Sequence, residues 1–103
     1  MIRHIVMFKF KEQANGKSKA ENLKEARERM MAMWGVIPQI KAMDVYFGAE
    51  GQKPANYDYI LVSDFESLED LETYQAHPMH VAFGQYVKEL REPDGRACVD
   101  YQL

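Results

Sequence analysis

Hydrophobic residues recur along this chain at two spacings, and these predict a mixture of strands and helices. Alternation with a period of two predicts four strands, at residues 2–11, 40–47, 57–65 and 96–103. Spacings of three and four predict a helix that begins after Ser18, within a capping box, and ends near Gly35. Two more helical pieces are expected, one from Ser67 and one from Pro78.

The dipeptide His77-Pro78 predicts a break in the second helical region. A residue before proline is pushed out of helical geometry, whereas proline itself suits the first position of a new helix. The new helix is expected to run to about Arg91, and Pro93-Asp94-Gly95 predicts a turn before the last strand.

The predicted order is strand, helix, strand, strand, split helix, strand. This β-α-β-β-α-β order is typical of an α+β, ferredoxin-like fold with a four-stranded antiparallel sheet. A length of 103 residues fits one domain, so we expect a single domain over residues 1–103.

Each predicted strand carries apolar residues on both of its faces. In the first strand Val6 and Phe8 occupy one face, with His4, and Ile5 and Met7 occupy the other. Two helices can cover only one face, which should be the one that carries His4. An uncovered apolar sheet would be sticky, so we expect a homodimer through the second sheet face, with the two chains related by a twofold axis.

The composition of the chain argues against a nucleic-acid or membrane partner and indicates a cellular compartment. The formal net charge is -3 and no basic cluster is present, so no nucleic-acid partner is expected. No apolar stretch is long enough to cross a bilayer, and no signal peptide is evident, so we expect no membrane partner. Cys98, the only cysteine, fits a reducing compartment and lies in a predicted strand, where we interpret it as a small core residue. A cytoplasmic protein is the resulting expectation.

Three segments carry a resemblance to a known family: residues 3–11 (RHIVMFKFK), 64–74 (DFESLEDLETY) and 77–81 (HPMHV), with an echo at 99–101 (VDY). Together they resemble the stress-responsive α/β-barrel (Dabb) family. The resemblance implies a dimeric α/β barrel with the helices outside. Many members are known only as folded or stress-induced proteins, and a few are cofactor-free catalysts, including a plant polyketide cyclase that closes a ring by aldol condensation.

The resemblance to that cyclase implies roles for individual residues. His80 corresponds to a general base that removes a proton beside a carbonyl, and Tyr74 to the group that hydrogen-bonds the developing enolate oxygen. His4 and His77 would line or orient the site. The cyclase has a histidine where this chain has Tyr59, so the polar lining of the pocket differs and the substrate need not be a polyketide.

A pocket is expected between the helix-covered sheet face and the split helix, lined also by Phe8, Tyr59 and Phe83. Each candidate has a structural alternative. His77 fits a helix cap, and His4, His80 and Tyr74 fit buried packing residues. Three functions are therefore open. The protein binds or converts a small hydrophobic carbonyl compound without a cofactor, or it is a non-catalytic stress-associated dimer, or it is a cofactor-free monooxygenase of the related barrel family.

Metal and cofactor signals are weak in the sequence. His77 and His80 lie across the proline break, with no carboxylate pattern to complete a ligand set. Gly48 and Gly51 lack both the spacing of a phosphate-binding loop and a following helix. We therefore expect no metal and no nicotinamide or nucleotide cofactor.

Overall fold

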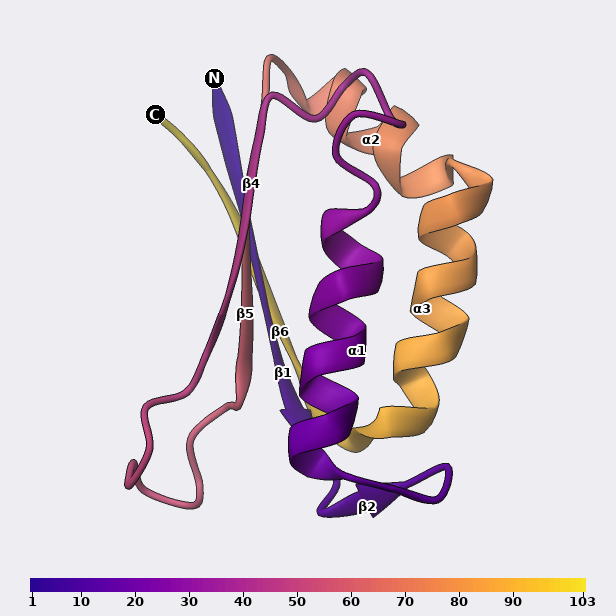
Figure 1. Cartoon of the computed structure of the whole chain (residues 1–103). Helices are drawn as coiled ribbons and strands as arrows, with labels where there is room; N and C mark the ends of the chain where they lie inside the picture. The colour runs from indigo at the N-terminus through magenta and orange to yellow at the C-terminus, as the bar shows by residue number, and fades with distance from the viewer.

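The computed structural model describes all of residues 1–103, and its central feature is a four-stranded antiparallel sheet with the order β4-β5-β1-β6 (Figure 1). The predicted α+β, ferredoxin-like fold is confirmed. The elements in chain order are β1 (Ile2–Phe10), β2 (Gln13–Ala14), β3 (Lys17–Ser18), α1 (Lys19–Met31), β4 (Ala42–Phe47), β5 (Tyr59–Phe65), α2 (Leu68–Ala76), α3 (Pro78–Leu90) and β6 (Arg91–Gln102).

All three helices lie on one face of the sheet, with α1 and α3 side by side and α2 beyond the end of α1 (Figure 1). The covered face is the one that carries the even-numbered residues of β1, as predicted. His4, Val6, Phe8 and Phe10 are all buried. They belong to the layer between sheet and helices, in which an 18-residue hydrophobic cluster forms the core.

The other sheet face has no cover within the chain. Val99 is 55% exposed and Tyr101 42% exposed, while Ile5, Met7 and Val62 are partly exposed. The register places Ile5 directly between Val62 on β5 and Val99 on β6. These residues form a continuous apolar strip across the three strands, which we call the outer strip.

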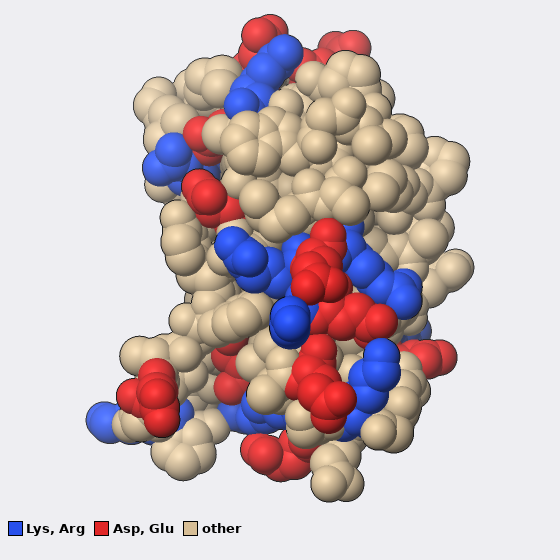
Figure 2. Space-filling view, in the orientation of Figure 1, with Lys and Arg blue, Asp and Glu red and all other residues tan.

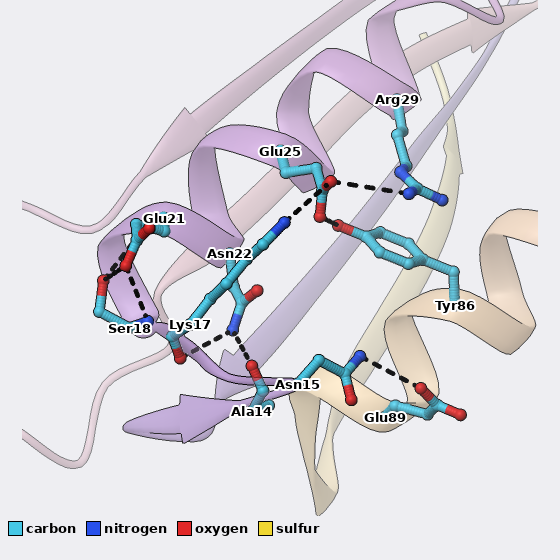
Figure 3. A network of polar contacts seen from close by, with 10 residues as sticks. All are labelled: Ala14, Asn15, Lys17, Ser18, Glu21, Asn22, Glu25, Arg29, Tyr86 and Glu89. Atoms are coloured by element: carbon cyan, nitrogen blue, oxygen red, sulfur yellow. Dashed lines mark hydrogen bonds and ion pairs between the residues drawn. The ribbon is translucent and has the colours of Figure 1, made fainter.

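Helix α1 begins where the sequence predicts. The Ser18 side chain accepts the backbone N–H of Glu21, and the Glu21 carboxylate accepts the backbone N–H of Ser18. The preceding loop forms the small β2–β3 hairpin, whose turn residues Asn15 and Gly16 have positive φ values of 52° and 75°. The buried Asn22 donates to the Ala14 carbonyl and so ties α1 to this hairpin (Figure 3).

A clamp around Glu25 holds α1 to α3. One oxygen of Glu25 accepts the Tyr86 hydroxyl at 2.9 Å, and the other accepts from Lys17 at 3.3 Å (Figure 3). The Arg29 guanidinium lies 3.9 Å from the centre of the Tyr86 ring. Over this part of the surface, acidic and basic side chains lie intermixed, while much of the area above is uncharged (Figure 2).

The predicted turn at Pro93-Asp94-Gly95 is wrong. Strand β6 begins at Arg91, which pairs with Phe10, and its register against β1 shifts before Arg96 pairs with Phe8. The turn-forming residues therefore make a bulge inside a strand. Gly95 is required there, because a Cβ atom would lie 2.7 Å from the Lys9 carbonyl oxygen.

One helix prediction also needs correction. Helix α1 ends at Met31, before the predicted end near Gly35, and residues 32–39 continue as turns that keep Met33 and Ile37 buried. None of the helices is long and apolar enough to pass through a bilayer.

Candidate functional site

A cavity of about 230 Å³ lies between the helix-covered sheet face and α3. Six of its twelve lining residues are hydrophobic, and the polar ones include two histidines and two arginines. The lining residues are His4, Val6, Phe8, Met30, Leu61, Gln75, His80, Phe83, Gly84, Val87, Arg91 and Arg96. An apolar chamber with a few convergent polar groups is the usual form of a small-molecule site.

His80 presents one ring nitrogen without a partner. Its Nδ1 atom lies 3.1 Å from the carbonyl oxygen of Gln75. Because a carbonyl oxygen can only accept, Nδ1 carries the hydrogen and Nε2 is left with a lone pair. No protein group bonds Nε2, and it is not among the polar atoms sealed off from solvent. Burial lowers the pKa of His80, so the neutral ring is favoured.

The His77-Pro78 break creates this arrangement. In an uninterrupted helix the Gln75 carbonyl would accept the backbone N–H of Met79, four residues on. Here that N–H donates to Nδ1 of His77 at 3.0 Å, which makes His77 the N-cap of α3. The Gln75 carbonyl is thereby left to orient His80. Sequence reasoning placed His77 at the site, and the structure places it at the helix cap, outside the cavity lining.

His4 is held in place by the neighbouring strand β6. Asp100 lies directly across from His4 in the strand register, and its Oδ1 atom is 2.5 Å from His4 Nδ1. The His4 ring is buried, with edge contacts to the Phe65 and Tyr74 rings at centroid distances of 6.4 Å. This pairing fixes the orientation of His4 at the cavity wall.

Cys98 is next to the same histidine and not in the core. The interpretation as a small core residue is wrong, because Cys98 is exposed and its Sγ atom lies 3.7 Å from His4 Nδ1. Partial burial raises the pKa of the Cys98 thiol, which disfavours the thiolate.

Tyr74 packs against His80 but does not line the cavity. The two ring centroids are 4.5 Å apart, and Tyr74 is fully buried. Its hydroxyl donates to the Met30 sulfur at 3.7 Å. Met30 does line the cavity, so its side chain lies next to both the Tyr74 hydroxyl and the open space. Burial raises the pKa of Tyr74, which therefore remains a neutral hydrogen-bond donor.

The aromatic residues expected around the pocket divide into two groups. Phe8 and Phe83 line the cavity, and Phe83 also lines a shallow groove between α1 and α3. Tyr59 does not line the cavity. Its hydroxyl donates to the Ala26 carbonyl at 3.1 Å, and its ring packs on Phe8 and Phe10. Aromatic side chains therefore narrow the space without filling it.

Two arginines at the cavity were missed by sequence reasoning. Arg91 donates to the backbone carbonyls of Glu92 and Pro93, whereas Arg96 has no carboxylate within ion-pair distance. Asp100 was also missed. The strand register that brings Arg96 opposite Phe8 and Asp100 opposite His4 is the signal that would have found them, and it depends on the bulge at Gly95.

Comparison with known proteins gives one family and a consistent set of relatives. The profile of the family described as the stress responsive A/B barrel domain matches residues 2–103. Olivetolic acid cyclase from Cannabis sativa is 31% identical over 94 residues, which cover 88% of this chain and 87% of the cyclase.

Solved structures agree with the fold. A dimeric protein of unknown function and ferredoxin-like fold from Bacteroides fragilis aligns with a TM-score of 0.85 and 30% identity, over 99% of this chain and 95% of that one. Hydroxynitrile lyase from Passiflora edulis aligns with a TM-score of 0.79 over 99% of this chain and 92% of that one. At 16% identity, this second likeness shows a shared fold only.

Proposed function

Because the chain belongs to the stress responsive A/B barrel domain (Dabb) family, we propose that it binds a small apolar carbonyl compound in the cavity and removes a proton from it. The observation that carries the proposal is the unpartnered Nε2 atom of a neutral His80 at an apolar chamber. The similarity to a cyclase over most of both chains supports it.

His80 acts as the general base in this proposal. Its Nδ1–H bond to Gln75 leaves the Nε2 lone pair available to a bound ligand, and that lone pair takes a proton from the carbon beside the carbonyl. The Gln75 carbonyl oxygen stabilises the positive charge that forms on the ring, because it accepts a hydrogen bond from Nδ1–H. A lowered pKa keeps His80 unprotonated near neutral pH, which a base requires.

Tyr74 stabilises the enolate oxygen in the same scheme. Its neutral hydroxyl is a suitable donor, and its ring lies directly on His80. The hydroxyl now donates to Met30, whose unbranched side chain is flexible. Rotation of Met30 by the incoming ligand would bring the Tyr74 hydroxyl to the cavity wall.

A second copy of the chain covers the outer strip in this proposal. The strip is apolar and continuous, and no element of the chain packs on it. A structure of the same fold at 30% identity is described as dimeric. Two sheets packed through these faces would form a closed core with all helices outside, and each cavity would lie on the helix side of its own sheet.

Deuterium exchange tests the proton transfer directly. The protein is incubated in D₂O with straight-chain methyl ketones of increasing length, and deuterium at the carbon beside the carbonyl is measured by NMR. We expect exchange above the buffer rate in the wild type, and a loss of about a hundred- to ten-thousand-fold in the His80→Ala variant. Gln85→Ala is the matched control, because Gln85 is exposed on the same helix and does not line the cavity.

The outcomes separate chemistry from structure. Ligand binding retained in His80→Ala, together with lost exchange and an unchanged melting temperature, supports the base role. Equal exchange in wild type and His80→Ala would exclude it. A large fall in melting temperature with unchanged ketone binding would assign His80 to folding.

A further inference from the structure

Three potential metal ligands converge at the edge of the sheet beside the cavity. They are Nδ1 of His4, Sγ of Cys98 and a carboxylate oxygen of Asp100, and all lie within 4.8 Å of one another. His4 comes from β1, and the other two come from β6, where they stand two residues apart on the same face.

The geometry differs from that of a catalytic Cys-His-Asp triad. In a triad the nucleophile and the carboxylate contact opposite nitrogens of the imidazole, so that one orients the ring while the other gives up its proton. Here Cys98 Sγ lies 3.7 Å and Asp100 Oδ1 lies 2.5 Å from the same atom, Nδ1 of His4. The three donor atoms therefore lie close enough together for one ion to contact all of them.

We propose that His4, Cys98 and Asp100 form a binding site for a divalent metal ion of the zinc type. This site is separate from the proposed proton transfer by His80, and either can fail alone. A nitrogen, a sulfur and a carboxylate oxygen are a ligand set that tetrahedral Zn²⁺ accepts. Three protein ligands leave one position for water.

The distances fit this ion after a small movement of one side chain. Ligand bonds of about 2.0–2.1 Å for nitrogen and about 2.3 Å for sulfur place tetrahedral nitrogen and sulfur ligands about 3.6 Å apart. The observed separation is 3.7 Å. Nitrogen and oxygen ligands would be about 3.3 Å apart, so Asp100 must withdraw from 2.5 Å. Its side chain is 32% exposed and free to do so.

Metal binding would also change the protonation of Cys98 and His4. The Cys98 thiol proton leaves to solvent and the His4 ring hydrogen moves from Nδ1 to Nε2, because only a thiolate and an unprotonated nitrogen can bind the ion. The two negative charges of Cys98 and Asp100 then match the divalent ion. Since both of these residues are exposed, an ion can enter from solvent without opening the core.

Titration with Co²⁺, a spectroscopic substitute for Zn²⁺, tests the site on the whole chain. The wild type is expected to bind one ion per chain, with a thiolate-to-cobalt charge-transfer band and the visible absorption of a tetrahedral ion. Zn²⁺ should then displace it. Cys98→Ala should abolish the thiolate band and weaken Zn²⁺ binding at least about tenfold. Asp94→Asn, an exposed carboxylate change on the same strand, should leave both unchanged.

Asp100→Asn provides the second variant, and it should weaken Zn²⁺ binding while keeping the thiolate band. Circular dichroism of each variant checks that the sheet is folded. The proposal is overturned if the wild type shows no thiolate band, or if Cys98→Ala binds Zn²⁺ as tightly as the wild type.

Discussion

The carbonyl oxygen of Gln75 lies 3.1 Å from Nδ1 of His80, and a helix broken between the two residues is what leaves that oxygen free. Proline at position 78 has no N–H to offer, and the Met79 N–H is taken by the His77 ring. The residues of the segment 77–80 therefore act together. His77 caps α3, and this leaves the Gln75 carbonyl free to orient His80 as a base.

The His77→Ala variant should lose stability and should also hold the His80 ring less firmly. The orphan Met79 N–H costs roughly 0.5–2 kcal/mol of stability. It also becomes free to compete for the Gln75 carbonyl, which loosens His80. Denaturation gives the stability change, and the ¹⁵N spectrum of the His80 ring reports whether Nδ1 still carries the hydrogen.

His77→Asn is the matched control, because asparagine is a good N-cap residue and should restore most of the stability. If His77→Ala left both the stability and the His80 spectrum unchanged, the cap would have no role in orienting His80.

Local patterns predicted most of the fold because each relevant signal lies within a few residues. The capping box at Ser18, the break at His77-Pro78 and the alternation in β1 are each decided by near neighbours. The bulge at Gly95 was misread as a turn because its cause is a close approach of Lys9, which is distant in sequence. The same long-range register brings Asp100 and Cys98 to His4, so no local pattern could reveal that cluster.

Met30→Ala should enlarge the cavity toward Tyr74. Met30 is buried, so its truncation should cost about 2–5 kcal/mol, measured by denaturation. The Tyr74 hydroxyl loses its sulfur partner and comes to face the enlarged space. Longer methyl ketones should then bind more tightly than in the wild type, as measured by NMR line broadening.

Met30→Leu keeps the side-chain volume while removing the sulfur, and should cost less than about 1.5 kcal/mol. It should not change the preferred ketone length. If Met30→Ala also left the preferred ketone length unchanged, Met30 would not separate Tyr74 from the ligand space.

The ion pair between Arg3 and Asp64 makes stability depend on acidic pH. Two hydrogen bonds join them, at 2.8 and 3.0 Å, and the Arg3 guanidinium lowers the pKa of Asp64 below its usual range. A lowered folded-state pKa means that the contribution is complete above the unfolded value of about 3.9 and is lost as the pH falls through the folded value. Its size should be small, because Arg3 is partly exposed and water screens the pair.

Asp64→Asn should therefore be less stable than the wild type at pH 6, and the difference should shrink as the pH approaches 2. Urea denaturation at a series of pH values measures this. Asp94→Asn, on β6 with an exposed side chain and no ion pair, should show no such convergence. A constant difference between Asp64→Asn and the wild type at all pH values would exclude the linkage.

Val99→Asp should convert a dimer into monomers if a second chain covers the outer strip. Val99 is 55% exposed in the single chain and lies opposite Ile5, so a carboxylate there would be desolvated against apolar side chains of the partner. Sedimentation velocity at micromolar concentration should show a dimer for the wild type and a monomer for the variant. Val81→Asp is the matched control, because Val81 is 47% exposed on α3 and the same change there should leave the dimer intact. A wild-type monomer at these concentrations, or a Val99→Asp variant that sediments as a dimer, would show that this face does not join two chains, and the apolar outer strip would need another partner.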